Sequence, residues 1–123
     1  MTSQIILELH SKRLSDFDLL RIAKAQDSNF DAPITAYLCG VAIKNNAAVG
    51  VVFGHTQKAK YGQFDDGHVM RTSLIAAVRK EGRFWVVTTQ NSRYVIATFQ
   101  KGNGRNSLRR FHQQLPMDCE VVH

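Results

Sequence analysis

The strongest constraint on the fold is a run of strand-like segments between His68 and Phe99. Three segments are rich in Val, Ile, Thr and aromatic residues, which favour β-strands: residues 68–78, 84–89 and 93–99. The short turn sequences at residues 80–82 and 90–92 separate them, and connections of this length join antiparallel neighbours. We therefore expect a three-stranded antiparallel meander in the second half of the chain.

A hairpin is predicted before the meander. Residues 34–43 carry apolar side chains at helical spacing, but their β-branched content and Gly40 favour a strand over a helix. Asn45 and Asn46 tolerate the positive φ angles of a tight turn. The valine-rich residues 49–53 then supply the second strand, and the apolar run at residues 5–9 is a further strand candidate.

Two helices are predicted, one near each end of the chain. Ser15 is a suitable cap and Asp18 lies at the third helical position, so the first helix is expected over residues 16–26. The second helix is expected to start at a cap on Asn106 or Ser107 and to end before Pro116. Its apolar residues share one face and point to the core: Leu108, Phe111 and Leu115.

These elements predict an α+β fold. The expected architecture is a small, strongly bent antiparallel sheet or barrel of about five strands, with an N-terminal and a C-terminal helix. The 123 residues are the size of one domain, so residues 1–123 are taken as a single domain. No apolar run reaches the roughly 18 residues of a membrane span, and no secretory signal is evident, so we expect a cytoplasmic protein without a membrane partner.

The charge of the chain is strongly asymmetric. The net charge is +6, and residues 1–56 contribute nothing to it, because they hold five basic and five acidic residues. Residues 57–123 hold eleven basic and five acidic residues, and residues 82–117 contain no acid. A one-sided basic field is typical of proteins that bind nucleic acid or another polyanion, although a solvated basic face that only aids solubility gives the same pattern.

The two cysteines, Cys39 and Cys119, indicate no metal or redox site. They lie 80 positions apart without C-x-x-C spacing, so they are expected to be unpaired thiols in a reducing compartment. No cofactor is predicted.

The main candidate site is the basic segment at residues 100–110. Gly102 and Gly104 permit a close backbone approach to a ligand, and the helix that follows attracts anions at its N-terminus. Two aromatic residues on neighbouring strands offer a stacking surface for unpaired bases. The predicted binding residues are Arg93, Lys101, Arg105, Arg109, Arg110, Trp85 and Tyr94. The alternative interpretation is a glycine turn that leads into an amphipathic helix with a solvated outer face.

A second cluster consists of His55, Asp65, Asp66 and His68. Two imidazoles and two carboxylates within 14 residues are a donor set for a divalent metal or an acid–base pair. However, Asp-Asp-Gly is a common turn sequence and no known ligand spacing is matched. We therefore predict a turn here, with no metal site and no catalytic residue.

Part of the chain resembles small uncharacterised proteins of phages, plasmids and gene cassettes. Those proteins carry a G-H … F-x-D-G-x4-T-S segment followed by T-x-N-S-x-Y. The corresponding residues here are Gly54-His55 … Phe64 to Ser73 and Thr89 to Tyr94. The resemblance covers about residues 50–100 and implies mobile DNA as the setting; it carries over no catalytic residue.

Three functions are compatible with these observations. The first is a non-enzymatic binding module for an anionic partner, nucleic acid first, encoded on a mobile element. The second is a protein-interaction module or homo-oligomer, because the edge strands of a small sheet must be paired or covered. The third is a small nuclease-like enzyme that would use the histidine and aspartate cluster, which no motif supports.

Overall fold

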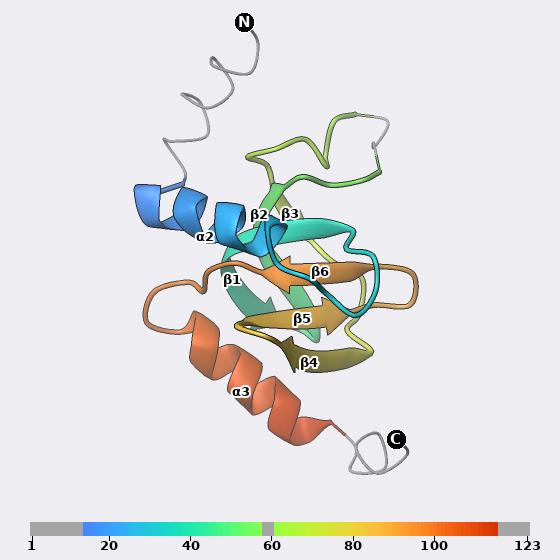
Figure 1. Cartoon of the computed structure of the whole chain (residues 1–123). Coiled ribbons are helices and arrows are strands. Elements are labelled where there is room, and N and C mark those ends of the chain that lie inside the picture. Colours follow the sequence, from blue (N-terminus) through green and yellow to red (C-terminus); the bar gives the residue numbers. More distant parts are fainter. Residues whose placement is uncertain (1–13, 58–60, 116–123) are drawn as a thin grey trace, which may run out of the picture.

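The computed structural model describes residues 14–57 and 61–115 (Figure 1). Along the chain the elements are α2 (Asp16–Gln26), β1 (Ala36–Lys44), β2 (Ala47–Phe53), β3 (Val69–Arg71), β4 (Ala77–Glu81), β5 (Phe84–Thr88), β6 (Arg93–Ile96) and α3 (Gly104–Gln114). The predicted strand at residues 5–9, Cys119 and Pro116 lie outside the described residues.

The six strands form one open sheet in the order β3-β2-β1-β6-β5-β4. Strands β1 and β6 run parallel, with Ala36 opposite Tyr94, and every other neighbouring pair is antiparallel. The α+β class with two helices is therefore confirmed. Three finer predictions are wrong: the barrel, the purely antiparallel sheet and the count of about five strands. The parallel pairing of β1 with β6 joins two antiparallel units into one six-stranded sheet, and the two edges of this sheet do not meet.

The predicted meander exists as β4-β5-β6, but its first strand begins later than expected. The predicted segment 68–78 divides into β3, which pairs with β2, and β4, which pairs with β5. Between them the chain changes partners, since Ile75 N–H donates to the carbonyl of Asn46 whereas Ala76 N–H donates to that of Thr88. One apolar segment therefore supplies strands to opposite edges of the sheet.

The predicted hairpin is confirmed as β1 and β2. Asn45 and Asn46 have φ angles of 51° and 64°, so both occupy the left-handed region that a tight two-residue turn requires. Gly40, at φ 62°, lies in an irregularity of the pairing between Cys39 and Ala42. Gly40 explains why the apolar residues of segment 34–43 do not alternate regularly, because a bulge shifts the inward-facing positions of the strand by one residue.

The N-terminal helix begins and ends as predicted. The Ser15 hydroxyl accepts a hydrogen bond from Asp18 N–H, and the Asp18 carboxylate accepts one from Ser15 N–H, which completes a capping box. Leu14 and Leu19 pack in the same apolar cluster, as expected of a hydrophobic staple.

The C-terminal helix begins earlier than predicted. Its cap is Asn103 rather than Asn106 or Ser107, and that residue makes no side-chain capping bond. The Ser107 hydroxyl is buried and instead donates to the Gly104 carbonyl and accepts from Ile43 N–H. Ser107 therefore links α3 to β1, although in the sequence it resembles a helix N-cap.

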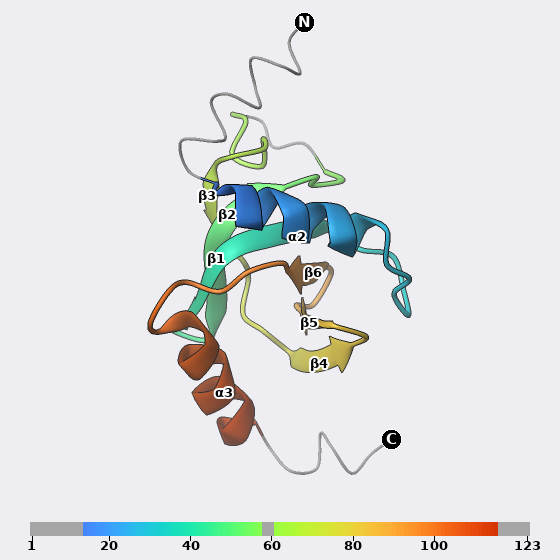
Figure 2. The ribbon, with the colours of Figure 1, turned by 60° about the vertical axis from the view of Figure 1, so that its left-hand side comes forward.

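The two helices cover opposite faces of the sheet (Figure 2). Helix α2 covers the face that carries Cys39, Val86 and Val95. The other face carries the larger cluster, including Leu38 and Ile96, and α3 closes it with three apolar residues: Leu108, Phe111 and Leu115. Among the described residues, no helix has the length and apolar character needed to cross a membrane.

Candidate functional site

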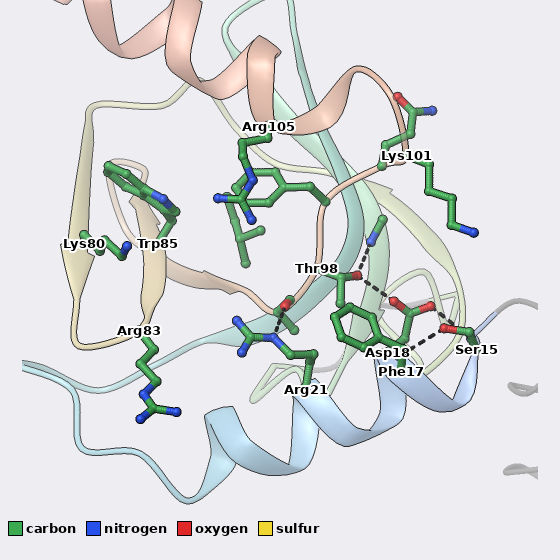
Figure 3. A pocket seen from close by; sticks show the side chains of 15 residues that line it. Ser15, Phe17, Asp18, Arg21, Lys80, Arg83, Trp85, Thr98, Lys101 and Arg105 are labelled. Carbon is green, nitrogen blue, oxygen red and sulfur yellow. Dashed lines mark hydrogen bonds between the residues drawn. The ribbon is translucent and has the colours of Figure 1, made fainter.

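A hollow of about 920 Å³ opens between the N-terminal ends of α2 and α3, at the end of β6 (Figure 3). The chain from Ala97 to Lys101 crosses it and is held against β1, where Val41 N–H donates to the Thr98 carbonyl. We call this concavity the basic hollow; its lining residues are Ser15, Phe17, Asp18, Arg21, Gly40, Lys80, Arg83, Trp85, Ile96, Ala97, Thr98, Phe99, Gln100, Lys101 and Arg105.

Five cationic side chains surround the basic hollow, and they come from five different parts of the fold. Arg21 belongs to α2, Lys80 to β4 and Arg83 to the turn between β4 and β5, while Lys101 precedes α3 and Arg105 lies in its first turn. Within residues 14–57 and 61–115, the ion pairs are Arg79–Asp31 and Arg93–Glu81, so none of these five cations is paired with a carboxylate.

Among the residues that the structure describes, Asp18 is the one carboxylate in the lining, and it already serves as an acceptor within the fold. One of its oxygens accepts from the Thr98 hydroxyl at 2.7 Å and the other from Ser15 N–H at 2.9 Å. Thr98 in turn accepts from Gly40 N–H at 2.9 Å. These bonds fix α2 to the sheet, and the lining keeps a strong excess of positive charge.

Aromatic rings lie among the cations. The Lys80 ammonium is 5.9 Å from the centroid of the half-buried Trp85 ring, and the Arg105 guanidinium is 4.5 Å from that of Phe99. Such contacts hold a cation in place without neutralising its charge. Phe17, on α2, is 62% exposed at the rim.

The first turn of α3 contributes to the positive character of the basic hollow. It contains no acidic residue, and the helix dipole adds partial positive charge at this end. Gly104 makes a close backbone approach to the sheet itself, because a Cβ atom there would lie 2.3 Å from the Val41 carbonyl oxygen. The glycine thus allows α3 to start directly against β1, which places Arg105 over the hollow.

The structure brings three of the seven predicted binding residues to the hollow, namely Trp85, Lys101 and Arg105. Arg109 and Arg110 are exposed further along α3 and do not line it. Two others have roles inside the fold. Arg93 is ion-paired with the buried Glu81 and donates to the Ala32 carbonyl, and Tyr94 is 6% exposed in the main apolar cluster.

Sequence reasoning missed Arg21, Lys80 and Arg83. Arg21 lies in the half of the chain whose charges cancel, so its position gave no signal. Lys80 lies near the end of β4 and Arg83 lies in the two-residue turn that follows it. The register of this hairpin places Lys80 directly opposite Trp85. A search for cations opposite aromatic residues across a predicted turn would have found this pair.

The histidine and aspartate cluster forms a loop, as its turn sequence predicts. The His55 ring stacks on Phe64 with centroids 4.1 Å apart, and Asp66 accepts from Gly54 N–H at 2.7 Å. His68 Nδ1 is 3.1 Å from the carbonyl oxygen of Asp65. Burial lowers the pKa of His55. In the part of the chain that the structure describes, no three His, Cys, Asp or Glu side chains lie where they could hold one metal ion.

No family model, curated protein or solved structure matches the chain.

Proposed function

We propose that the protein is a non-enzymatic binding module for a polyanion and that the basic hollow is its binding surface. Nucleic acid is the polyanion that we consider first. The observation that carries this proposal is the convergence of five cations, none of them in an ion pair among the described residues, on one concavity with a single, internally bonded carboxylate. Gathering like charges is unfavourable for the fold itself, which indicates a ligand that compensates for their repulsion.

The chemistry of the cations fits phosphate. Arg21, Arg83 and Arg105 present planar guanidinium groups that donate paired hydrogen bonds to phosphate oxygens, whereas Lys80 and Lys101 act as compact charges. Spread around a concavity, such groups fit several linked phosphates better than one isolated anion. Nucleic acid is therefore preferred over a small acidic ligand, and a mobile genetic element as its setting remains a prediction from the resemblance.

Fluorescence anisotropy with labelled single- and double-stranded DNA and RNA tests the proposal. We expect Arg105→Gln to weaken binding about tenfold at low salt, the size of effect typical of one lost hydrogen bond to a charged group. Gln retains part of the side-chain stem but removes both the charge and the guanidinium that lies 4.5 Å from the Phe99 centroid.

The matched control is Arg110→Gln, on the same helix. Arg110 is exposed and outside the hollow, where its Nη2 is 3.4 Å from the Asn103 side chain. We expect a change of less than about threefold, since exposed charges away from the contact are screened. Equal losses for the two variants would argue against the basic hollow as the binding surface.

A second candidate function, self-association, is favoured by one observation at the β3 edge. Val69 and Leu74 are 61% and 66% exposed on and beside this short edge strand. Pairing of two β3 edges would cover both side chains. Light scattering across a concentration series tests it: a constant monomer mass argues against association, and a concentration-dependent dimer that Val69→Lys abolishes supports it.

A further inference from the structure

We propose that the basic hollow takes unpaired nucleotides, with bases stacked on Trp85 and Phe17 and backbone phosphate held between Arg21 and Arg105. This inference rests on the proposed function and specifies the form of nucleic acid. It goes beyond charge, because it assigns the two ends of the hollow to bases and its middle to phosphate.

The arrangement of the labelled side chains supports this division (Figure 3). Trp85 lies on one side of the hollow with Lys80 and Arg83, and Phe17 lies on the other side beside Asp18 and Thr98. The guanidinium groups of Arg21 and Arg105 lie between them. Aromatic rings at two ends with cations between match a strand whose bases alternate with its phosphates.

Trp85 is held as a fixed stacking surface. Its indole packs against the main apolar cluster, and His112 contacts it edge-on with ring centroids 5.7 Å apart. On the neighbouring strand, Lys80 is its direct cross-strand partner. A ring fixed in this way loses little side-chain entropy when a base stacks on it, and it accepts any base because every base has a π face.

The two central arginines are oriented before a ligand arrives. The Arg105 guanidinium lies 4.5 Å from the Phe99 centroid. The Arg21 guanidinium lies 4.4 Å from the Phe84 centroid, and its Nε donates to the Ala97 carbonyl at 3.1 Å. Each group keeps N–H donors beyond these contacts. Guanidinium groups held over a ring in this way can donate paired hydrogen bonds to phosphate oxygens.

A duplex suits this site less well than a single strand. Paired bases are stacked inside the helix, so a duplex offers its phosphates on a convex surface and cannot place a base face on Trp85 or Phe17. Unpaired bases reach aromatic side chains directly, which is the basis of most single-strand recognition. The aromatic side chains of the hollow therefore favour single strands, while its charge alone would favour neither form.

Trp85 makes the test site-specific, because it is the one tryptophan of the 123 residues. The probes are a DNA single strand of about 12 nucleotides, a duplex with the same number of phosphates, and base-free inorganic polyphosphate of similar length. We expect the single strand to quench Trp85 fluorescence and to bind at least about tenfold more tightly than the duplex. Polyphosphate should bind without comparable quenching.

Phe17→Ala completes the test, with Leu20→Ala as its control. Both side chains are exposed on α2, at 62% and 54%, so neither substitution threatens the fold, and only Phe17 lines the hollow. Loss of one base stack should weaken single-strand binding about tenfold and leave duplex binding unchanged. Leu20→Ala should change neither.

Two outcomes separate the inference from the function on which it rests. Equal affinity for single strand and duplex, with no effect of Phe17→Ala, would overturn the unpaired-base inference and leave polyanion binding intact. No binding of any of the three probes would overturn the proposed function as well.

Discussion

At the residue scale, the buried ion pair of Glu81 and Arg93 shows why a basic residue in an acid-free stretch need not bind a ligand. The side chains are 5% and 17% exposed. Glu81 also accepts from Asp31 N–H at 2.9 Å, so the pair links β4, β6 and the loop after α2. The sequence separation of 12 residues gave no indication of this contact, because it depends on the β4-β5-β6 register.

Glu81→Gln is expected to destabilise the fold by about 2 kcal/mol, since it leaves the Arg93 guanidinium partly buried without its counter-charge. Chemical denaturation at neutral pH measures the loss. The matched control is Asp31→Asn in the exposed Arg79–Asp31 pair, where both side chains are more than 60% exposed. That change should cost about 0.5 kcal/mol or less.

The same pair predicts a pH dependence of stability. Burial alone would raise the pKa of Glu81. The net effect is a pKa below its ordinary value, because Glu81 accepts hydrogen bonds from Asp31 N–H and Arg93 and lies near the positive charges of Arg93 and Arg79. A carboxyl whose pKa falls on folding stabilises the protein fully above its unfolded pKa. This contribution is lost as pH falls through the lower, folded pKa. Unfolding midpoints measured from pH 7 to pH 3 should fall less steeply in Glu81→Gln than in the unsubstituted protein; parallel curves would contradict this account.

Cys39 is predicted to be chemically inert in the folded protein. Burial, followed by the charge of Asp18, raises its pKa to about 12, against a smaller opposing effect of a hydrogen bond with Thr98. In a Cys119→Ser variant, a thiol reagent at pH 8 should therefore modify nothing until denaturant is added. Rapid modification under native conditions would show that β1 is more accessible than its 1% exposure at Cys39 indicates.

At the scale of elements, helix starts were predictable where the signal is local. The α2 capping box lies within four consecutive residues, from Ser15 to Asp18, and the sequence located it correctly. The start of α3 depends instead on contacts with β1, through Ser107 and Gly104. Those contacts join residues more than 60 positions apart, so local capping rules assigned the wrong start.

Gly104→Ala is expected to destabilise the protein by about 2 kcal/mol. The added Cβ would meet the Val41 carbonyl oxygen at 2.3 Å and the Phe99 Cβ at 3.0 Å, so α3 must shift away from β1. Because Arg105 is the next residue, the same shift should weaken polyanion binding. Denaturation and anisotropy measure the two effects. Asn106→Ala, at an exposed position in the same helical turn, is the control and should change stability by less than about 0.5 kcal/mol.

At the scale of the whole molecule, the basic hollow is a product of topology. The charge asymmetry indicated Lys101 and Arg105, and the aromatic pattern indicated Trp85, because those signals lie within one stretch of sequence. Arg21 and Lys80 join them only through the packing of α2 on the sheet and the pairing of β4 with β5. The parallel pairing of β1 with β6 brings the two antiparallel units together, and no local sequence pattern predicts it.

The most direct test of the central claim is the salt dependence of single-strand binding in two charge-matched triple variants. One variant neutralises the hollow, with Lys80→Gln, Lys101→Gln and Arg105→Gln. The other neutralises three exposed cations elsewhere, with Lys24→Gln, Lys44→Gln and Arg71→Gln. Five phosphate contacts predict that the affinity of the unsubstituted protein falls about 100-fold between about 50 and 200 mM salt.

The two triples carry the same net charge, so only the location of the lost charges differs. We predict that the hollow variant loses about two units of the slope of log affinity against log salt, and that the control variant keeps the slope nearly unchanged. Equal reductions in the two variants would contradict the account, because binding would then follow total charge and not the basic hollow.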